Sequence, residues 1–138
     1  MSLKDYIFRK PVTFTINCIE IEGMCHIVYP KGHFDAAASG NAEKTIVEIV
    51  EKTNNLIFNL NELQYVSSAG LRVFLIVAKK MKVKNCSLHF CCLNPSVRQV
   101  FEISNFHTFL EIHDSEDDAL DKVKLKAQNS GNNGGVLK

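Results

Sequence analysis

Strand-like and helix-like segments follow one another along most of this 138-residue chain. The first, at 12–21, alternates between apolar and polar residues. The second, at 25–29, follows a turn and is closed by Pro30 and Gly32, so the two form a predicted hairpin. The pattern then predicts helices and strands in turn, at 35–54 (helix), 56–60, 71–83 (helix), 87–93, 95–101 (helix), 109–112 and 116–127 (helix). Strands joined through helices pair in parallel, so the order predicts an α/β fold with a mixed, largely parallel sheet.

One domain is expected, covering residues 1–127. A chain of this length normally forms a single domain, and its core is large enough to need no disulfide or metal. Residues 128–138 contain too few apolar side chains to bury, so we expect a disordered C-terminal tail there.

The charge and hydropathy patterns exclude several classes of partner. Sixteen basic and 15 acidic residues give a net charge of +1, which provides no broad basic field for nucleic acid. The longest apolar run, residues 73–78, is far shorter than the roughly 18 residues of a membrane span. Residues 1–10 include four charged side chains and lack the continuous apolar segment that a signal peptide requires. We therefore expect a cytoplasmic protein that binds neither nucleic acid nor membrane.

Catalysis is not expected. The sequence has no glycine-rich phosphate-binding motif, no nucleophile elbow and no His-Glu-x-x-His zinc motif. Its five histidines are scattered, and none stands at a spacing that reveals a catalytic triad. The sequence therefore predicts a protein that is not an enzyme.

One candidate metal site lies around His89, with Cys86, Cys91 and Cys92 as the other ligands. The segment has the alternation of a strand, so neighbouring cysteines point to opposite faces and cannot converge on one ion. We expect no metal and no cofactor.

The most informative segment lies between the strand that ends at Leu60 and the helix that begins at Leu71. A loop is predicted at 61–66, followed by a turn at 67–70 (SSAG). Both serines then lie where a helix has free N–H groups and a positive dipole end. One interpretation is N-capping, and the other is a phosphoacceptor whose phosphoryl group the helix start would stabilise.

Three segments resemble one protein family. Residues 60–71 (LNELQYVSSAGL) resemble the family's spaced apolar residues followed by Asp-Ser, a small residue, Gly and Leu. Residues 30–35 (PKGHFD) resemble its Gly-x-apolar-Asp motif, and residues 94–97 (NPSV) its loop before the third helix. Over about residues 12–127 the chain thus resembles STAS-domain proteins of the anti-sigma factor antagonist type. The resemblance implies a four- to five-stranded mixed sheet with about four helices packed mainly on one side.

The resemblance also implies a function. Such proteins are small bacterial regulators that bind an anti-sigma factor and thereby release the sigma factor. The anti-sigma factor is itself a GHKL-type serine kinase that phosphorylates the serine after the motif's aspartate, and a phosphatase can reverse the reaction. By position that serine is Ser68. Ser67 replaces the aspartate and is the second choice.

The expected partner-binding residues surround that turn and begin with Asp35, which is equally well explained as the N-cap of the first helix. Arg72 stands one turn beyond Ser68, where it can pair with a phosphate or an acidic partner. Val73 and Ile76 widen the helix's apolar arc, so either the fold or a partner covers them. The full set is Asp35, Ser67, Ser68, Ala69, Gly70, Arg72, Val73 and Ile76. We expect a monomer or weak dimer.

The residues leave two other functions open. The replacement of the aspartate by Ser67 favours a constitutive scaffold or adaptor, as in a signalling or lipid-transport complex, without phosphorylation. A module that holds a nucleotide phosphate at the helix start has no motif to support it.

Overall fold

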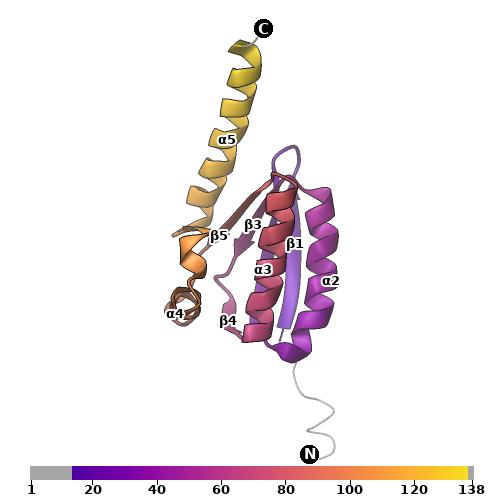
Figure 1. The fold of residues 1–138 in the computed structure, drawn as a ribbon, viewed down its shortest axis with the longest axis vertical. Helices are drawn as coiled ribbons and strands as arrows, with labels where there is room; N and C mark the ends of the chain where they lie inside the picture. The colour runs from indigo at the N-terminus through magenta and orange to yellow at the C-terminus, as the bar shows by residue number, and fades with distance from the viewer. Residues whose placement is uncertain (1–13, 137–138) are drawn as a thin grey trace, which may run out of the picture.

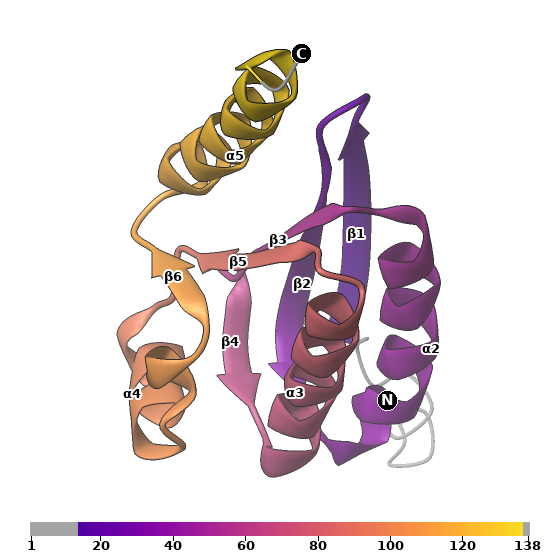
Figure 2. The same ribbon diagram turned by 45° about the horizontal axis from the view of Figure 1, so that its top comes forward.

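The computed structural model describes the backbone of residues 14–136 and the side chains of residues 14–127. Within this range, one mixed sheet has the strand order β1-β2-β3-β5-β6, and β4 also pairs with β2 (Figures 1 and 2). The strands are β1 (Phe14–Ile21), β2 (Cys25–Phe34), β3 (Asn55–Asn59), β4 (Leu63–Val66), β5 (Ser87–Cys91) and β6 (Glu111–His113). Among the strands of residues 14–136, the pair β1–β2 is antiparallel and the other pairs are parallel.

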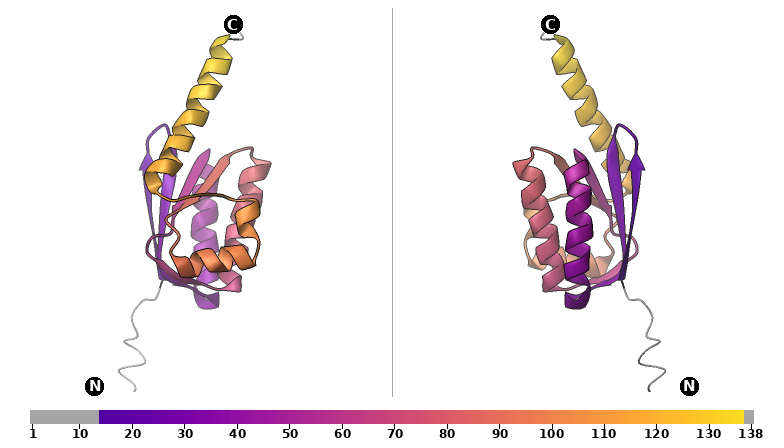
Figure 3. Two further views of the ribbon diagram at one scale, coloured as in Figure 1. Left: turned by 90° about the vertical axis from the view of Figure 1, so that its left-hand side faces the viewer. Right: turned by 90° about the vertical axis from the view of Figure 1, so that its right-hand side faces the viewer.

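Helices lie on both faces of the sheet but mainly on one. The helices are α2 (Ala36–Lys52), α3 (Ser68–Val83), α4 (Pro95–Ile103) and α5 (Glu116–Val136), with a short 3-10 turn η1 (Phe106–Thr108). Figure 3 shows α2 and α3 side by side on one face, with α5 towards the other. This arrangement confirms the predicted α/β class.

The strand β2 is longer than predicted because it changes partner along its length. Its residues 26–28 pair with β3, whereas residues 32–34 pair with β4. Pro30 lies between these two regions and is paired with Ile16 of β1, so the strand continues through it. The prediction that the strand closes at Pro30 is therefore wrong.

The prediction of a loop at residues 61–66 is also wrong, because β4 occupies Leu63–Val66. Its side chains are buried, exposed, exposed and buried in turn, and a register shift interrupts the pairing with β2. Without the alternation of a regular strand, the segment gives no strand signal. In the described part of the chain the sheet therefore has six strands, one more than the expected maximum.

Other element boundaries differ from the predictions by a few residues. The helix α3 begins at Ser68, so the predicted turn at 67–70 is its N-cap and first turn. The strand β5 ends at Cys91, because Cys92 has a left-handed backbone with φ of 63°. The predicted N-caps Asp35, Asn94 and Ser115 are confirmed, since each side chain accepts a bond from the N–H three residues on.

The helix α5 continues through Val136, into the segment expected to form a disordered tail. Its start is anchored by Glu116, whose Oε1 accepts bonds from Tyr29 Oη at 2.6 Å and Asn59 Nδ2 at 3.0 Å. Once such a turn is fixed, further turns need no new nucleation. No helix in the described part of the chain has the length and apolar composition that crossing a membrane requires.

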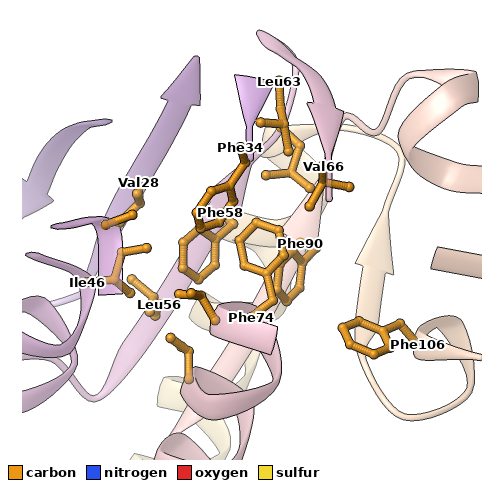
Figure 4. Packing of buried hydrophobic residues seen from close by; sticks show 14 of the residues in the cluster. Val28, Phe34, Ile46, Leu56, Phe58, Leu63, Val66, Phe74, Phe90 and Phe106 are labelled. Atoms are coloured by element: carbon orange, nitrogen blue, oxygen red, sulfur yellow. The ribbon is translucent and has the colours of Figure 1, made fainter. Parts of the chain in front are cut away.

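Phenylalanine rings fill the core between the sheet and α3 (Figure 4). Phe74 of α3 is fully buried at the centre of this group. Its ring lies 5.2 to 5.3 Å from the rings of Phe34, Phe58 and Phe90, and 6.0 Å from that of Phe101, always edge to face. One helix residue therefore contacts three strands and α4.

Phe74→Ala is expected to lower the free energy of unfolding by about 3 to 5 kcal/mol, because it leaves a cavity among these rings. The matched control is Val83→Ala in the same helix, where the valine is 87% exposed and the change should stay within about 0.5 kcal/mol. Urea denaturation followed by circular dichroism measures both. Equal, small effects would contradict the packing described.

Candidate functional site

The ends of β2 and β4 bring the starts of two helices together. These strands are parallel, and their last residues, Phe34 and Val66, are paired. The next residue on each strand is an N-cap, Asp35 for α2 and Ser67 for α3. Both helices therefore begin at the same edge of the sheet, at the lower end of the molecule in Figures 1 and 2.

Ser67 attaches the start of α3 to β2. Its N–H donates to the carbonyl of Phe34 at 2.9 Å, and its hydroxyl donates to the same oxygen at 3.0 Å. The hydroxyl oxygen also accepts from the N–H of Gly70 at 3.2 Å. Half-buried and bonded on both sides, Ser67 is a structural N-cap.

Asp35 has the corresponding role in α2. One carboxylate oxygen accepts from the N–H of Ala38 at 3.0 Å. The side chain is half-buried and carries a negative charge at the helix start, where the dipole favours it. The sequence interpretation as an N-cap is confirmed, and the pairing of β2 with β4 places this acid beside Ser67.

Ser68 is the first residue of α3 and is exposed. A helix leaves its first four N–H groups without intrahelical acceptors. Within the described residues, those of Ser67 and Gly70 are bonded to Phe34 and to the cap hydroxyl. The N–H groups of Ser68 and Ala69 have no such bond, so they remain available to water or to an anion.

Gly70 makes the close approach of α3 to β2 possible. It is buried, and a Cβ atom there would lie 2.7 Å from the carbonyl oxygen of Phe34 and 2.9 Å from Cγ2 of Val66. No side chain fits without displacing backbone. Gly70 therefore allows the start of α3 to pack against β2 beneath the exposed serine. Because Gly70 is buried, its assignment to the partner-binding surface is wrong.

The remaining candidates on α3 divide by exposure. Val73 is only 2% exposed and belongs to the core, so its assignment to the partner-binding surface is also wrong. The sequence left open whether the fold or a partner covers Val73, and in the structure the fold covers it. Arg72 is exposed, whereas Ala69 and Ile76 are half-buried.

An aromatic pair that the sequence analysis missed lies beside the site. His33 is exposed and Tyr65 is 50% exposed, and their rings meet edge to face at a centroid distance of 6.0 Å. They are paired residues of β2 and β4, one position before the paired ends of these strands. Because residues 61–66 were interpreted as a loop, nothing indicated that these rings meet.

The structure does not bring Cys86, Cys91 and Cys92 together with His89 as a set of metal ligands. Within the described residues, the one group of three or more His, Cys, Asp or Glu side chains close enough to share an ion is His89, Glu111 and His113. Neither Glu111 nor His113 was considered from the sequence, because the pairing of β5 with β6 brings them to His89.

The sequence matches the family model of the STAS domain over residues 16–119. BtrV of Bordetella bronchiseptica, named as a candidate anti-sigma factor antagonist, is 39% identical over 85 residues, which cover 59% of this chain and 73% of that protein. The anti-sigma F factor antagonist of Paenibacillus polymyxa is 26% identical over 101 residues, covering 72% and 86%.

Solved structures with low sequence identity share the fold. An anti-sigma factor antagonist from Mycobacterium paratuberculosis superposes with a TM-score of 0.74 at 20% identity, covering 80% of this chain and 94% of that one. The unphosphorylated form of the antagonist SpoIIAA gives 0.69 at 18% identity, covering 80% and 96%. Its phosphorylated form from Bacillus gives 0.63 at 17% identity, covering 79% and 99%.

Gly70→Ala is expected to lower the free energy of unfolding by about 1 to 3 kcal/mol, because the new methyl group overlaps the Phe34 carbonyl. Gly40→Ala is the matched control, since Gly40 lies inside α2 with nothing within 4 Å of its added Cβ. That change should stabilise the chain by up to about 1 kcal/mol through helix propensity. Urea denaturation of both variants measures the difference, and a Gly70→Ala protein as stable as Gly40→Ala would contradict the close approach.

Proposed function

The chain belongs to the STAS domain family, and we propose that it is an anti-sigma factor antagonist, which binds an anti-sigma factor and thereby releases a sigma factor. The names of its relatives support this function. In this proposal the protein is a binding regulator rather than an enzyme, and it acts in the cytoplasm as a monomer or weak dimer. Its binding surface, called here the helix-start surface, consists of Asp35, Ser67, Ser68, Ala69, Arg72 and Ile76.

The observation that carries the proposal is the pairing of Phe34 with Val66, which makes one surface from two helix starts. Without that pairing, Asp35 and Ser68 would not lie near each other. With it, a partner that contacts the start of α3 also contacts Asp35 at the start of α2. Arg72 extends the surface one turn along α3 and gives it a positive group for an acidic partner.

The second part of the proposal is control by phosphorylation at Ser68. An incoming kinase needs an accessible hydroxyl, and Ser68 is exposed whereas the hydroxyl of Ser67 is bonded to Phe34 and Gly70. Ser67 therefore becomes the less favoured acceptor. A related solved structure is the phosphorylated form of SpoIIAA, which supports modification of this kind of protein. The modifying partner would be a GHKL-type serine kinase, and a phosphatase would restore binding.

A phosphoryl group at Ser68 would be tolerated by the fold but would oppose binding. It adds about two negative charges next to the free N–H groups of Ser68 and Ala69, at the positive end of the α3 dipole. The helix start is thereby stabilised rather than melted. In a close interface the same charge must lose water and face any acidic partner group, which weakens the complex.

Ser67 in place of the family's aspartate changes charge but not architecture. Serine and aspartate are both good N-caps, so α3 keeps its start. The substitution removes one negative charge beside Ser68, leaving Asp35 as the nearest acid of the helix-start surface. A constitutive adaptor without phosphorylation is the alternative that this difference favours.

Ser68→Asp is expected to weaken binding to the cognate anti-sigma factor about tenfold or more, which corresponds to about 1.4 kcal/mol, whereas Ser68→Ala should bind nearly as tightly as the unmodified chain. Isothermal titration calorimetry measures both affinities. The matched control is Ser96→Asp, because Ser96 is an exposed serine in the first turn of α4 and the change adds the same charge at another helix start.

Two outcomes would count against the proposal. If Ser68→Asp binds as tightly as the unmodified chain, phosphorylation at this residue is not the switch. If the chain binds no anti-sigma factor, and a pull-down instead recovers a non-kinase partner that Ser68→Asp retains equally, the protein is the constitutive adaptor.

A further inference from the structure

Two parallel strands place three metal-ligating side chains on the face of the sheet towards α5. His89 of β5 is paired with Glu111 of β6, and Cys91 with His113. Alternate residues of a strand share a face, so His89, Glu111 and His113 point to one side. Cys91, on the same face, packs with Ala119 and Val123 of α5, which identifies that side.

The three side chains converge within hydrogen-bond distance. Nδ1 of His89 lies 3.0 Å from Nε2 of His113 and 3.1 Å from Oε2 of Glu111. All three ligand atoms lie within 4.8 Å of one another. Two ligands bound tetrahedrally to one zinc ion at 2.0 to 2.2 Å are about 3.3 to 3.6 Å apart, so the separations of 3.0 and 3.1 Å would have to widen by only a few tenths of an ångström.

A shared cation explains this cluster better than hydrogen bonds alone. A neutral imidazole nitrogen carries either one proton or one lone pair. Nδ1 of His89 therefore cannot make a full-strength bond to both Glu111 and His113, although both lie at bonding distance. A metal ion accepts a lone pair from all three groups at once.

We propose that His89, Glu111 and His113 bind a divalent transition-metal ion of the zinc type. Two imidazoles and a carboxylate form a ligand set typical of zinc, with a fourth position left for water. The ion would fasten β6, a three-residue edge strand, to β5 and so fix the segment from which α5 begins.

The cluster lies between the interior and solvent. The side chain of His89 is only 2% exposed, so this ligand is held on the inner side of the site. The carboxylate of Glu111 is 54% exposed and opens the site to solvent. Lys122 and Lys126 of α5 lie close enough to His89 to oppose a cation, and they limit the affinity.

The test uses the full chain, freed of metal with a chelator and titrated with ZnCl₂ in a calorimeter. One ion per chain is expected, together with a rise in Tm when zinc is added. Glu111→Gln and His113→Gln keep the shape of two accessible ligands and should each weaken binding more than about 100-fold, since even outer-shell partners contribute 10- to 100-fold. Both should abolish the rise in Tm.

Two control variants separate this site from adventitious binding. His107→Gln removes an exposed histidine of η1, and Cys18→Ser removes the exposed thiol of β1, and neither should change affinity. Cobalt(II) provides a second readout, because nitrogen and oxygen ligands give visible absorption without a thiolate charge-transfer band. No binding by the unaltered chain, binding that survives both Glu111→Gln and His113→Gln, or a thiolate band would each overturn the proposal.

Discussion

Phe34 is the residue at which the sheet and two helices meet. Its carbonyl oxygen accepts both the N–H and the hydroxyl of Ser67, its ring packs in the core against Phe74, and the next residue caps α2. The approach requires Gly70, because any side chain there would overlap this carbonyl. The same contact that closes the core thus also fixes the geometry of the helix-start surface.

This arrangement gives the two neighbouring serines different tasks. The hydroxyl of Ser67 makes hydrogen bonds to Phe34 and Gly70 within the fold. Ser68 is exposed, at a helix start that these bonds already hold in place. A modification at Ser68 can therefore change the charge of the surface without disturbing the core. The same reasoning explains how the chain accommodates serine in place of the family's aspartate, since either side chain caps α3.

The sequence predicts the regular elements well and the irregular contacts poorly. Alternating strands, helix repeats and the caps Asp35, Asn94 and Ser115 are local signals, and all of them were readable. The strand β4 was not, because its buried residues are not spaced by two and a register shift interrupts its pairing. Contacts between distant segments were hidden for a related reason: strand register brings His89 to Glu111 and His113, and no spacing along the chain encodes it.

The most direct test of the account is to map phosphate on the protein isolated from its native cells, by intact mass and phosphopeptide analysis with and without phosphatase. The account predicts a single phosphoryl group on Ser68, since this hydroxyl is free of the hydrogen bonds that hold Ser67. A phosphate on Ser67, or none on either serine under any growth or stress condition, would contradict it.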